Sequence, residues 1–290
     1  MTTPRLDTDQ PEPAPGDRID RFTLQKPLGR GVSCHVFRAW DGANGTPVAV
    51  KIVNWANVRD RDAALKQLRT EATALARVRH PRVVRFIDFG QDARWPYLVL
   101  EFVEGRPLGE LLREGGALPP RWALYLLGQA IDGLDAVWKA GIVHRDVKPD
   151  NLIVGPSGIA KLIDFGLAKS EVLQLLDGPA SSELAGTAAY LAPEQARDAA
   201  AVDFRADVYS LGATLFEMLT GRLPFEGGSR MQTILRHMTA PAPAPSTLVP
   251  GLPQALDDLC QWMLAKAPED RPRSGEELRR GFTTAANAVE

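Results

Sequence analysis

The 290-residue sequence has little cysteine and no long apolar run, and each absence excludes a class of protein. Its two cysteines, Cys34 and Cys260, are too few and too far apart for a disulfide framework or a cysteine-based zinc site. No apolar run approaches the roughly 18–20 residues that a membrane-spanning helix needs. The N-terminus also lacks the apolar stretch of a signal peptide. We therefore expect a cytoplasmic protein with no membrane span.

Excess charge is also absent. Lys and Arg number 34 against 36 Asp and Glu, which leaves a net charge of −2. Nothing in this balance favours a nucleic-acid backbone, so we expect no nucleic-acid partner. Apolar residues make up 44% of the chain, which is ordinary for a globular protein with a core, and the length allows two lobes.

The sequence between residues 143 and 166 reads VHRDVKPDNLIVGPSGIAKLIDFG, and it predicts a hairpin. Two short apolar runs, 152–154 and 160–163, flank the segment Gly-Pro-Ser-Gly at 155–158. Glycine and proline at that point favour a tight reversal, so the two runs should pair as antiparallel strands.

Several polar residues would meet at the open end of this hairpin. With the reversal centred between residues 157 and 158, Asn151 and Asp164 lie opposite each other. An amide oxygen and a carboxylate form a hard-oxygen site that suits Mg²⁺. Asp146 and Lys148 stand just upstream, and a carboxylate base, a lysine and a divalent-ion site are what phosphoryl transfer requires. A polar surface hairpin would explain any one of these residues but not all of them in this order.

The region from residue 21 to residue 103 reads as strands around one helix. Gly29 and Gly31 lie in a turn where backbone N–H groups could approach phosphates, although an ordinary hairpin turn explains them as well. Lys51 follows a buried-looking apolar run, where a lysine is costly without an anionic partner. Glu71 lies on the apolar face of an amphipathic helix expected at 62–78, so we predict an ion pair between Lys51 and Glu71.

The ends and the second half of the chain have different patterns. Residues 1–20 contain four prolines and little to bury, which predicts a disordered leader. Asp207 begins a nearly all-apolar helix, where it should accept backbone N–H bonds. Residues 241–253 form a Pro-rich connector, and residues 286–290 form a C-terminal tail. Helices are expected at 121–140, 207–220, 230–239, 255–266 and 274–285.

Eight motifs occur in a fixed order along the chain: LGRGVSCHV from Leu28, VAVK ending at Lys51, Glu71, HRDVKPDN, DFG, GTAAYLAPE, DVYSLG and DRP. Together they resemble the signature set of the eukaryotic-type protein kinases, and among these the bacterial Ser/Thr kinases, over about residues 22–283. The resemblance implies a two-lobed α+β fold. The N-lobe (21–103) would hold a five-stranded antiparallel sheet and one helix, and the C-lobe (104–285) would be mainly helical.

The resemblance also implies catalytic roles. Lys51 would hold the α- and β-phosphates of ATP, steadied by Glu71. Asp146 would accept the proton of the acceptor hydroxyl, with Lys148 beside the transferring phosphate. Further positions would have structural roles: an ion pair of Glu194 with Arg271, and an apolar column of Leu75, Phe86, His144 and Phe165.

Two other groups of residues would bind the cofactors. Asn151 and Asp164 would hold Mg²⁺ or Mn²⁺. The remaining nucleotide contacts would come from Leu28, Gly29, Gly31, Val36, Ala49, Leu100, Glu101, Val103 and Ile153. The family's third loop glycine is Cys34 here, and a side chain at this position would narrow the space above the phosphates.

The implied function is transfer of the ATP γ-phosphate to Ser and Thr hydroxyls of protein substrates, together with autophosphorylation. Lys148 and Thr187 are typical of Ser/Thr rather than Tyr kinases. Arg145 before the catalytic aspartate implies control by a phosphate on the activation segment, where Ser181 and Ser182 are candidates.

Two other classes remain as alternatives. One is a pseudokinase or scaffold that binds nucleotide without turnover, although such proteins usually lose the Lys, Asp or Asn that this chain retains. The other is a small-molecule phosphotransferase, although that class generally lacks the GT…APE segment present here.

Overall fold

The computed structural model describes residues 12–31, 34–55, 58, 60–165, 186, 188–198 and 202–289. The chain divides into a first unit, Met1–Arg77 with Val84–Val103, and a second unit, Val78–Val83 with Glu104–Glu290. Among the residues of interest from the sequence, Gly166, Ser181, Ser182 and Thr187 lie outside the described residues. Each helix in the described part of the chain is too short or too polar to cross a membrane.

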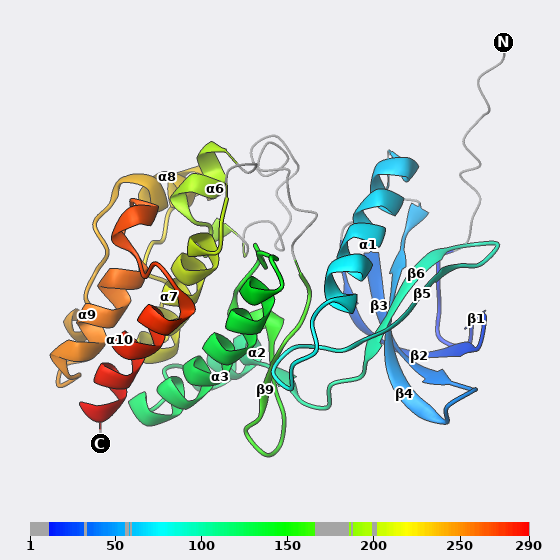
Figure 1. Ribbon diagram of the computed structural model, residues 1–290, viewed down its shortest axis with the longest axis horizontal. Helices are drawn as coiled ribbons and strands as arrows, with labels where there is room; N and C mark the ends of the chain where they lie inside the picture. The colour runs from blue at the N-terminus through cyan, green and yellow to red at the C-terminus, as the bar shows by residue number, and fades with distance from the viewer. Residues whose placement is uncertain are drawn as a thin grey trace, which may run out of the picture. The chain divides into compact units, whose positions relative to one another are not determined.

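The first unit is built on an antiparallel sheet in the order β1-β2-β3-β4-β6-β5 (Figure 1). Its strands are β1 (Arg18–Ile19), β2 (Phe22–Arg30), β3 (Cys34–Asp41), β4 (Thr46–Val53), β5 (Phe86–Gln91) and β6 (Pro96–Glu101). Helix α1 (Arg61–Ala76) begins at Asp60, whose side chain accepts the N–H of Ala63, and it packs against β5 and β6. The sheet has six strands rather than the five expected, because β1 adds one.

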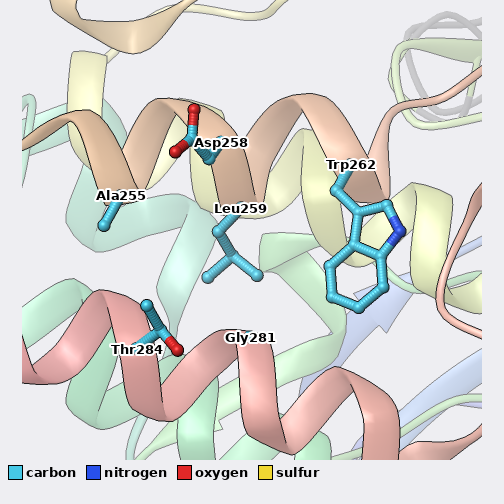
Figure 2. A pocket seen from close by; sticks show the side chains of 6 residues that line it. All are labelled: Ala255, Asp258, Leu259, Trp262, Gly281 and Thr284. Carbon is cyan, nitrogen blue, oxygen red and sulfur yellow. The ribbon is translucent and has the colours of Figure 1, made fainter.

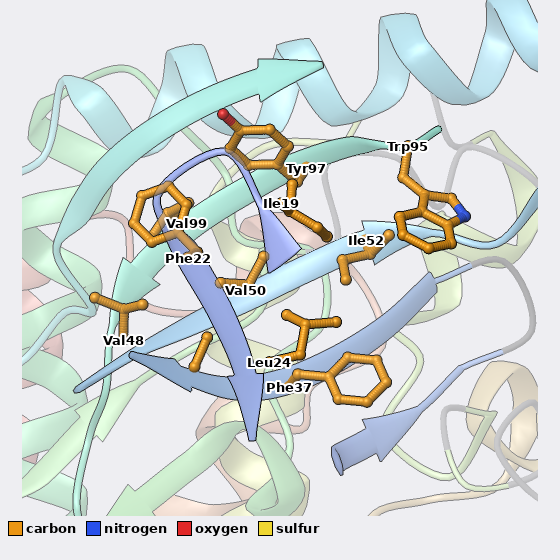
Figure 3. Packing of buried hydrophobic residues seen from close by; sticks show 11 residues of the cluster. Ile19, Phe22, Leu24, Phe37, Val48, Val50, Ile52, Trp95, Tyr97 and Val99 are labelled. Atoms are coloured by element: carbon orange, nitrogen blue, oxygen red, sulfur yellow. The ribbon is translucent and has the colours of Figure 1, made fainter. Parts of the chain in front are cut away.

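Strand β1 lies within the segment that the sequence assigns to a disordered leader. Ile19 is fully buried in an apolar cluster with residues of β2, β3, β4 and β6 (Figure 3). Backbone carbonyls next to Ile19 also have hydrogen-bond donors. The Arg94 side chain donates to the carbonyl of Arg18 at 2.8 Å, and the Leu24 N–H donates to the carbonyl of Asp17 at 2.8 Å. Residues just before position 21 are therefore part of the packed first unit.

Strand alternation places the two faces of β4 in different surroundings. Val48, Val50 and Ile52 lie in the apolar cluster (Figure 3). Successive side chains of a strand point to opposite faces, so Ala49 and Lys51 point away from that cluster.

The second unit is mainly helical, with a small three-stranded sheet, so the expected α+β class is confirmed. Helix α7 (Arg205–Thr220) is buried along most of its length and packs against α3 (Pro120–Lys139) and α9 (Gln254–Met263), which explains its apolar sequence. Helices α2 and α6 were not expected. The elements are β7 (Arg106–Pro107), α2 (Leu108–Gly115), α3 (Pro120–Lys139), η2 (Pro149–Asn151), β8 (Leu152–Val154), β9 (Ala160–Leu162), α6 (Pro193–Arg197), α7 (Arg205–Thr220), α8 (Arg230–Thr239), η3 (Pro245–Thr247), α9 (Gln254–Met263), η4 (Pro268–Asp270) and α10 (Gly275–Asn287).

Replacing Ile19 tests whether the leader is part of the first unit. We expect Ile19→Ala to lower the free energy of unfolding by about 2–5 kcal/mol, because it leaves a cavity in the core. Leu28→Ala is the control, since Leu28 is 44% exposed and its loss should change stability by no more than about 0.5 kcal/mol. Urea unfolding of the three proteins is the measurement. Equal midpoints for the Ile19 variant and the parent would show that β1 does not contribute to the core.

Candidate functional site

The predicted hairpin is present, but its register differs by one residue from the expected one. Leu152, Ile153 and Val154 of β8 pair with Leu162, Lys161 and Ala160 of β9. The turn closes over 155–159 and is centred on residue 157, so Ile163 rather than Asp164 lies opposite Asn151; its N–H donates to the Asn151 carbonyl at 2.9 Å. Asp164 follows in the left-handed region, with φ 55°.

Asp146 lies at the centre of a buried polar network. Its carboxylate is 3.1 Å from the Lys148 ammonium. The side-chain nitrogen of Asn151 donates to the Asp146 carboxylate at 2.9 Å and to its carbonyl at 2.8 Å. Because the amide nitrogen of Asn151 is used in this way, it is the amide oxygen that could serve as a ligand for a cation. The structure thus brings together three of the residues that the sequence selected.

The neutral imidazole ring of His144 accepts a hydrogen bond from the backbone of this network. Its Nδ1 accepts the N–H of Asp146 at 3.3 Å, and its Nε2 lies 3.2 Å from the carbonyl of Ile163. These partners require the tautomer with the proton on Nε2, and burial lowers the pKa of His144. The ring also stacks on Phe165 at 4.6 Å between centroids.

Asp207 holds the turn that carries these residues. It accepts the backbone N–H groups of His144 at 2.8 Å and of Arg145 at 2.7 Å, and the indole N–H of Trp138 at 2.9 Å. Burial raises the pKa of Asp207, while the three donors favour the carboxylate. Arg145 has φ 67°, a conformation that costs a non-glycine residue about 1–3 kcal/mol and needs such support.

The prediction that Asp207 accepts backbone N–H bonds is confirmed, and the donors belong to the 144–145 turn. Helix α7 begins after Phe204 with no side-chain cap, and the partners of Asp207 lie more than 60 residues upstream. A different residue was missed altogether. Gln129 of α3 accepts the Ala160 N–H at 2.9 Å and donates to the Gly158 carbonyl at 3.0 Å, which ties the hairpin to α3. A buried acid or amide on an apolar helix face is the sequence signal for such a role, because it must have partners.

The first unit contains the predicted ion pair. The Lys51 ammonium is 2.9 Å and 3.0 Å from the two carboxylate oxygens of Glu71. The Glu71 side chain is only 3% exposed, so the contact is shielded from water.

The residues expected around the nucleotide base share a face of the sheet with Lys51. Val36 pairs with Lys51, and Ala49 pairs with Leu100. Directly paired residues lie on the same face of a sheet, and Ala49 is two residues from Lys51 on the same strand. The side chains of Val36, Ala49, Lys51 and Leu100 therefore point to one face.

The other residues expected to contact the nucleotide differ in their hydrogen bonds, exposure and unit. Gly29 pairs with Val36, and the Gly31 N–H closes a turn onto the Cys34 carbonyl at 2.8 Å. Leu28 is largely exposed. The N–H of Glu101 donates to the Arg85 carbonyl at 2.9 Å, so it is not available to a ligand. Val103 ends the first unit, whereas Ile153 belongs to β8 of the second.

The resemblance also implies an ion pair and an apolar column, and their residues can be located within each unit. Arg271, fully buried, makes a two-pronged pair with Glu194 at 2.6 Å and 2.8 Å. Leu75 is buried in α1 and Phe86 begins β5 of the first unit, while His144 and Phe165 form the stack in the second unit.

A groove of about 270 Å³ lies elsewhere in the second unit, between α9 and α10 (Figure 2). None of the predicted site residues contributes to it. It is lined by Ala255, Asp258, Leu259, Trp262, Gly281 and Thr284.

Comparison with known proteins agrees with the fold. The model of the protein kinase domain family matches residues 22–282, so the chain belongs to that family. Among solved structures, the Mycobacterium tuberculosis PknI kinase domain has a TM-score of 0.73 at 25% identity, covering 94% of this chain and 99% of that one. Rad53 1-466 in complex with AMP-PNP also has a TM-score of 0.73 at 25% identity, covering 90% of this chain and 65% of that one.

Two bacterial proteins are among the curated relatives. Serine/threonine-protein kinase PknL of Mycobacterium tuberculosis is 38% identical over 87% of this chain and 62% of its own length. The probable serine/threonine-protein kinase PknB of Bifidobacterium longum is 36% identical over 92% of this chain and 40% of its own. The chain thus spans less than two thirds of the length of these relatives.

Asp207→Asn tests the support of the turn. An asparagine presents an NH₂ group to N–H donors, so we expect the free energy of unfolding to fall by about 1–3 kcal/mol. We also expect faster hydrogen exchange at the amides of His144 and Arg145. Asp203→Asn is the control just before the same helix, because Asp203 makes a partly exposed pair with Arg205 and accepts its backbone N–H at 2.9 Å, but does not contact the 144–145 turn; it should leave the exchange at His144 and Arg145 unchanged. Unchanged exchange at both amides would contradict the role given to Asp207.

Proposed function

We propose that this chain is a serine/threonine protein kinase that transfers the γ-phosphate of ATP to hydroxyl groups of proteins. The observation that carries the proposal is the buried Asp146 carboxylate, which Lys148 and Asn151 contact directly. A scaffold that only binds nucleotide has no need to bury and orient these three groups together. The names of the curated relatives support the same activity.

In this proposal the second unit prepares the acceptor. Asp146 orients the hydroxyl and accepts its proton, as a positioned general base does. Lys148, whose ammonium is 3.1 Å from the Asp146 carboxylate, would stabilise negative charge on the transferring phosphate. The hydrogen bond from Asn151 keeps the carboxylate of Asp146 in place before the acceptor arrives.

The nucleotide groups are assigned in the same way. Lys51 would bind the α- and β-phosphates, and its contact with Glu71 fixes the ammonium. The amide oxygen of Asn151 and the carboxylate of Asp164 are hard donors that fit Mg²⁺ or Mn²⁺. A bound divalent ion would neutralise charge on the phosphates.

The acceptor type and the control of activity follow from three residues. Lys148 and Thr187 indicate Ser or Thr as the acceptor. The Arg145 Nε atom is buried and has no hydrogen-bond partner among the described residues, which supports its proposed pairing with a phosphate on the activation segment. Autophosphorylation at Ser181, Ser182 or Thr187 would supply that phosphate, and we place the enzyme in the cytoplasm.

Asp146→Asn should keep ATP binding and lose turnover. A general base contributes on the order of 10²–10⁴-fold to rate, which corresponds to about 3–5.5 kcal/mol of barrier. We therefore expect a fall within that range, or somewhat beyond it because the carboxylate also orients the hydroxyl. Calorimetry with MgATP and single-turnover phosphorylation of a generic protein acceptor are the two measurements.

Asp135→Asn is the control, since Asp135 contacts Lys139 and Arg279 and not the proposed site. It should bind nucleotide and turn over like the parent. Normal binding with parental turnover in the Asp146 variant would remove Asp146 as the base. Binding without turnover in the parent itself would indicate a pseudokinase.

A further inference from the structure

Gln195 of helix α6 has a buried side chain that joins two separate segments of the second unit. Its Oε1 accepts the N–H of Ala192 at 3.0 Å, and its Nε2 donates to the carbonyl of Arg145 at 3.1 Å. A backbone N–H can only donate and a carbonyl can only accept, so these partners fix which way the amide points. The bond to Arg145 connects residues that are 50 positions apart in the sequence.

The bond to Ala192 has a local explanation. Ala192 is the N-cap of α6 and Gln195 is the third residue of the helix. A Gln or a Glu at this position commonly accepts the N–H of the N-cap residue, so either would satisfy the helix end. An ionised Glu has no hydrogen to donate, whereas Gln has a second group to offer. The bond to Arg145 is therefore not needed to begin the helix.

The Arg145 carbonyl belongs to the peptide group that leads into Asp146. The N–H of the same peptide group donates to Nδ1 of His144 at 3.3 Å. The N–H of Arg145 itself donates to Asp207 at 2.7 Å, and Arg145 has φ 67°. This left-handed residue is thus held at its N–H from α7 and at its carbonyl from α6. Because Asp146 follows directly, a rotation of the peptide group would turn its carboxylate.

The segment that carries Gln195 is itself held in place. The Ser210 hydroxyl of α7 donates to the carbonyl of Tyr190 at 2.7 Å. Glu194, next to Gln195, pairs with the buried Arg271 at 2.6 Å. Gln195 therefore connects the turn to a segment that is fixed on α7 and on Arg271.

We propose that Gln195 is a positioning residue for phosphoryl transfer, because its hydrogen bond to the Arg145 carbonyl holds the backbone that aims Asp146 at the acceptor hydroxyl. The inference rests on the proposed function, in which Asp146 is the base. Gln195 acts through the main chain of residue 145 and not on the reacting atoms. It links the segment that contains the APE motif to the turn that carries the base.

Two variants of similar size separate the two bonds of Gln195. Gln195→Glu keeps an oxygen for the N–H of Ala192 but loses the donor to Arg145, and Gln195→Met loses both. We expect kcat for a generic protein acceptor to fall about tenfold in both variants, which is the order of effect of one hydrogen bond. The KM for ATP should stay within about twofold of the parent value. Rates are divided by the number of MgATP sites per chain from calorimetry, so that unfolded molecules are not counted.

Hydrogen exchange at two amides supplies a readout that does not depend on turnover. The amide of Asp146 should exchange faster in both variants, whereas that of Ala192 should exchange faster only in Gln195→Met. Gln254→Glu is the control, because Gln254 makes the same kind of amide bond to Asp258 on the exposed side of α9. It should leave kcat and both amides at their parental values.

A parental kcat in Gln195→Glu, with a loss in Gln195→Met, would reduce Gln195 to a helix cap and overturn the inference. Unchanged exchange at the Asp146 amide in both variants would also overturn it. In these two cases the parent is active, so the proposed function stands. A parent that transfers no phosphate would instead overturn the proposed function, and the inference with it.

Discussion

A buried carboxylate needs hydrogen-bond donors, and in the second unit the donors to the Asp207 carboxylate hold the turn that carries the candidate site. These donors are two backbone N–H groups of the 144–145 turn and the indole of Trp138. The turn is thereby held with Arg145 in a left-handed conformation. The same turn presents Asp146 to Lys148 and Asn151. One desolvated acid therefore fixes the geometry of the residues proposed to act on the acceptor.

In the first unit the buried charge that needs a partner is a cation, the Lys51 ammonium. Strand alternation puts Lys51 on the face opposite the apolar cluster, where it cannot remain unpaired at low cost. Helix α1 supplies Glu71, which is nearly as buried as the core leucines of the same helix. Each unit thus pre-organises its own charged groups: the Lys51–Glu71 pair in the first and Asp146 with Lys148 in the second.

Local periodicity explains what the sequence could predict. Glu71 could be paired with Lys51 because both break an apolar pattern, and the hairpin at 152–162 followed from its glycines and proline. The register was wrong by one residue, because composition alone does not say whether the loop has four or five residues. The partners of Asp207 lie too far away in sequence for any periodic argument. Strand β1 was missed because the burial of Ile19 arises from strands beyond the Pro-rich segment.

The most direct test of the account is phosphoamino-acid analysis after incubation with labelled ATP and Mg²⁺, with the parent chain and the Lys51→Met variant side by side. We expect label on phosphoserine and phosphothreonine in the parent and essentially none in the variant, because Lys51 is the residue proposed to bind the phosphates. The variant should keep its fold, checked by circular dichroism. Label on tyrosine alone, or equal labelling by the two proteins, would contradict the assignment of these residues to Ser/Thr phosphoryl transfer.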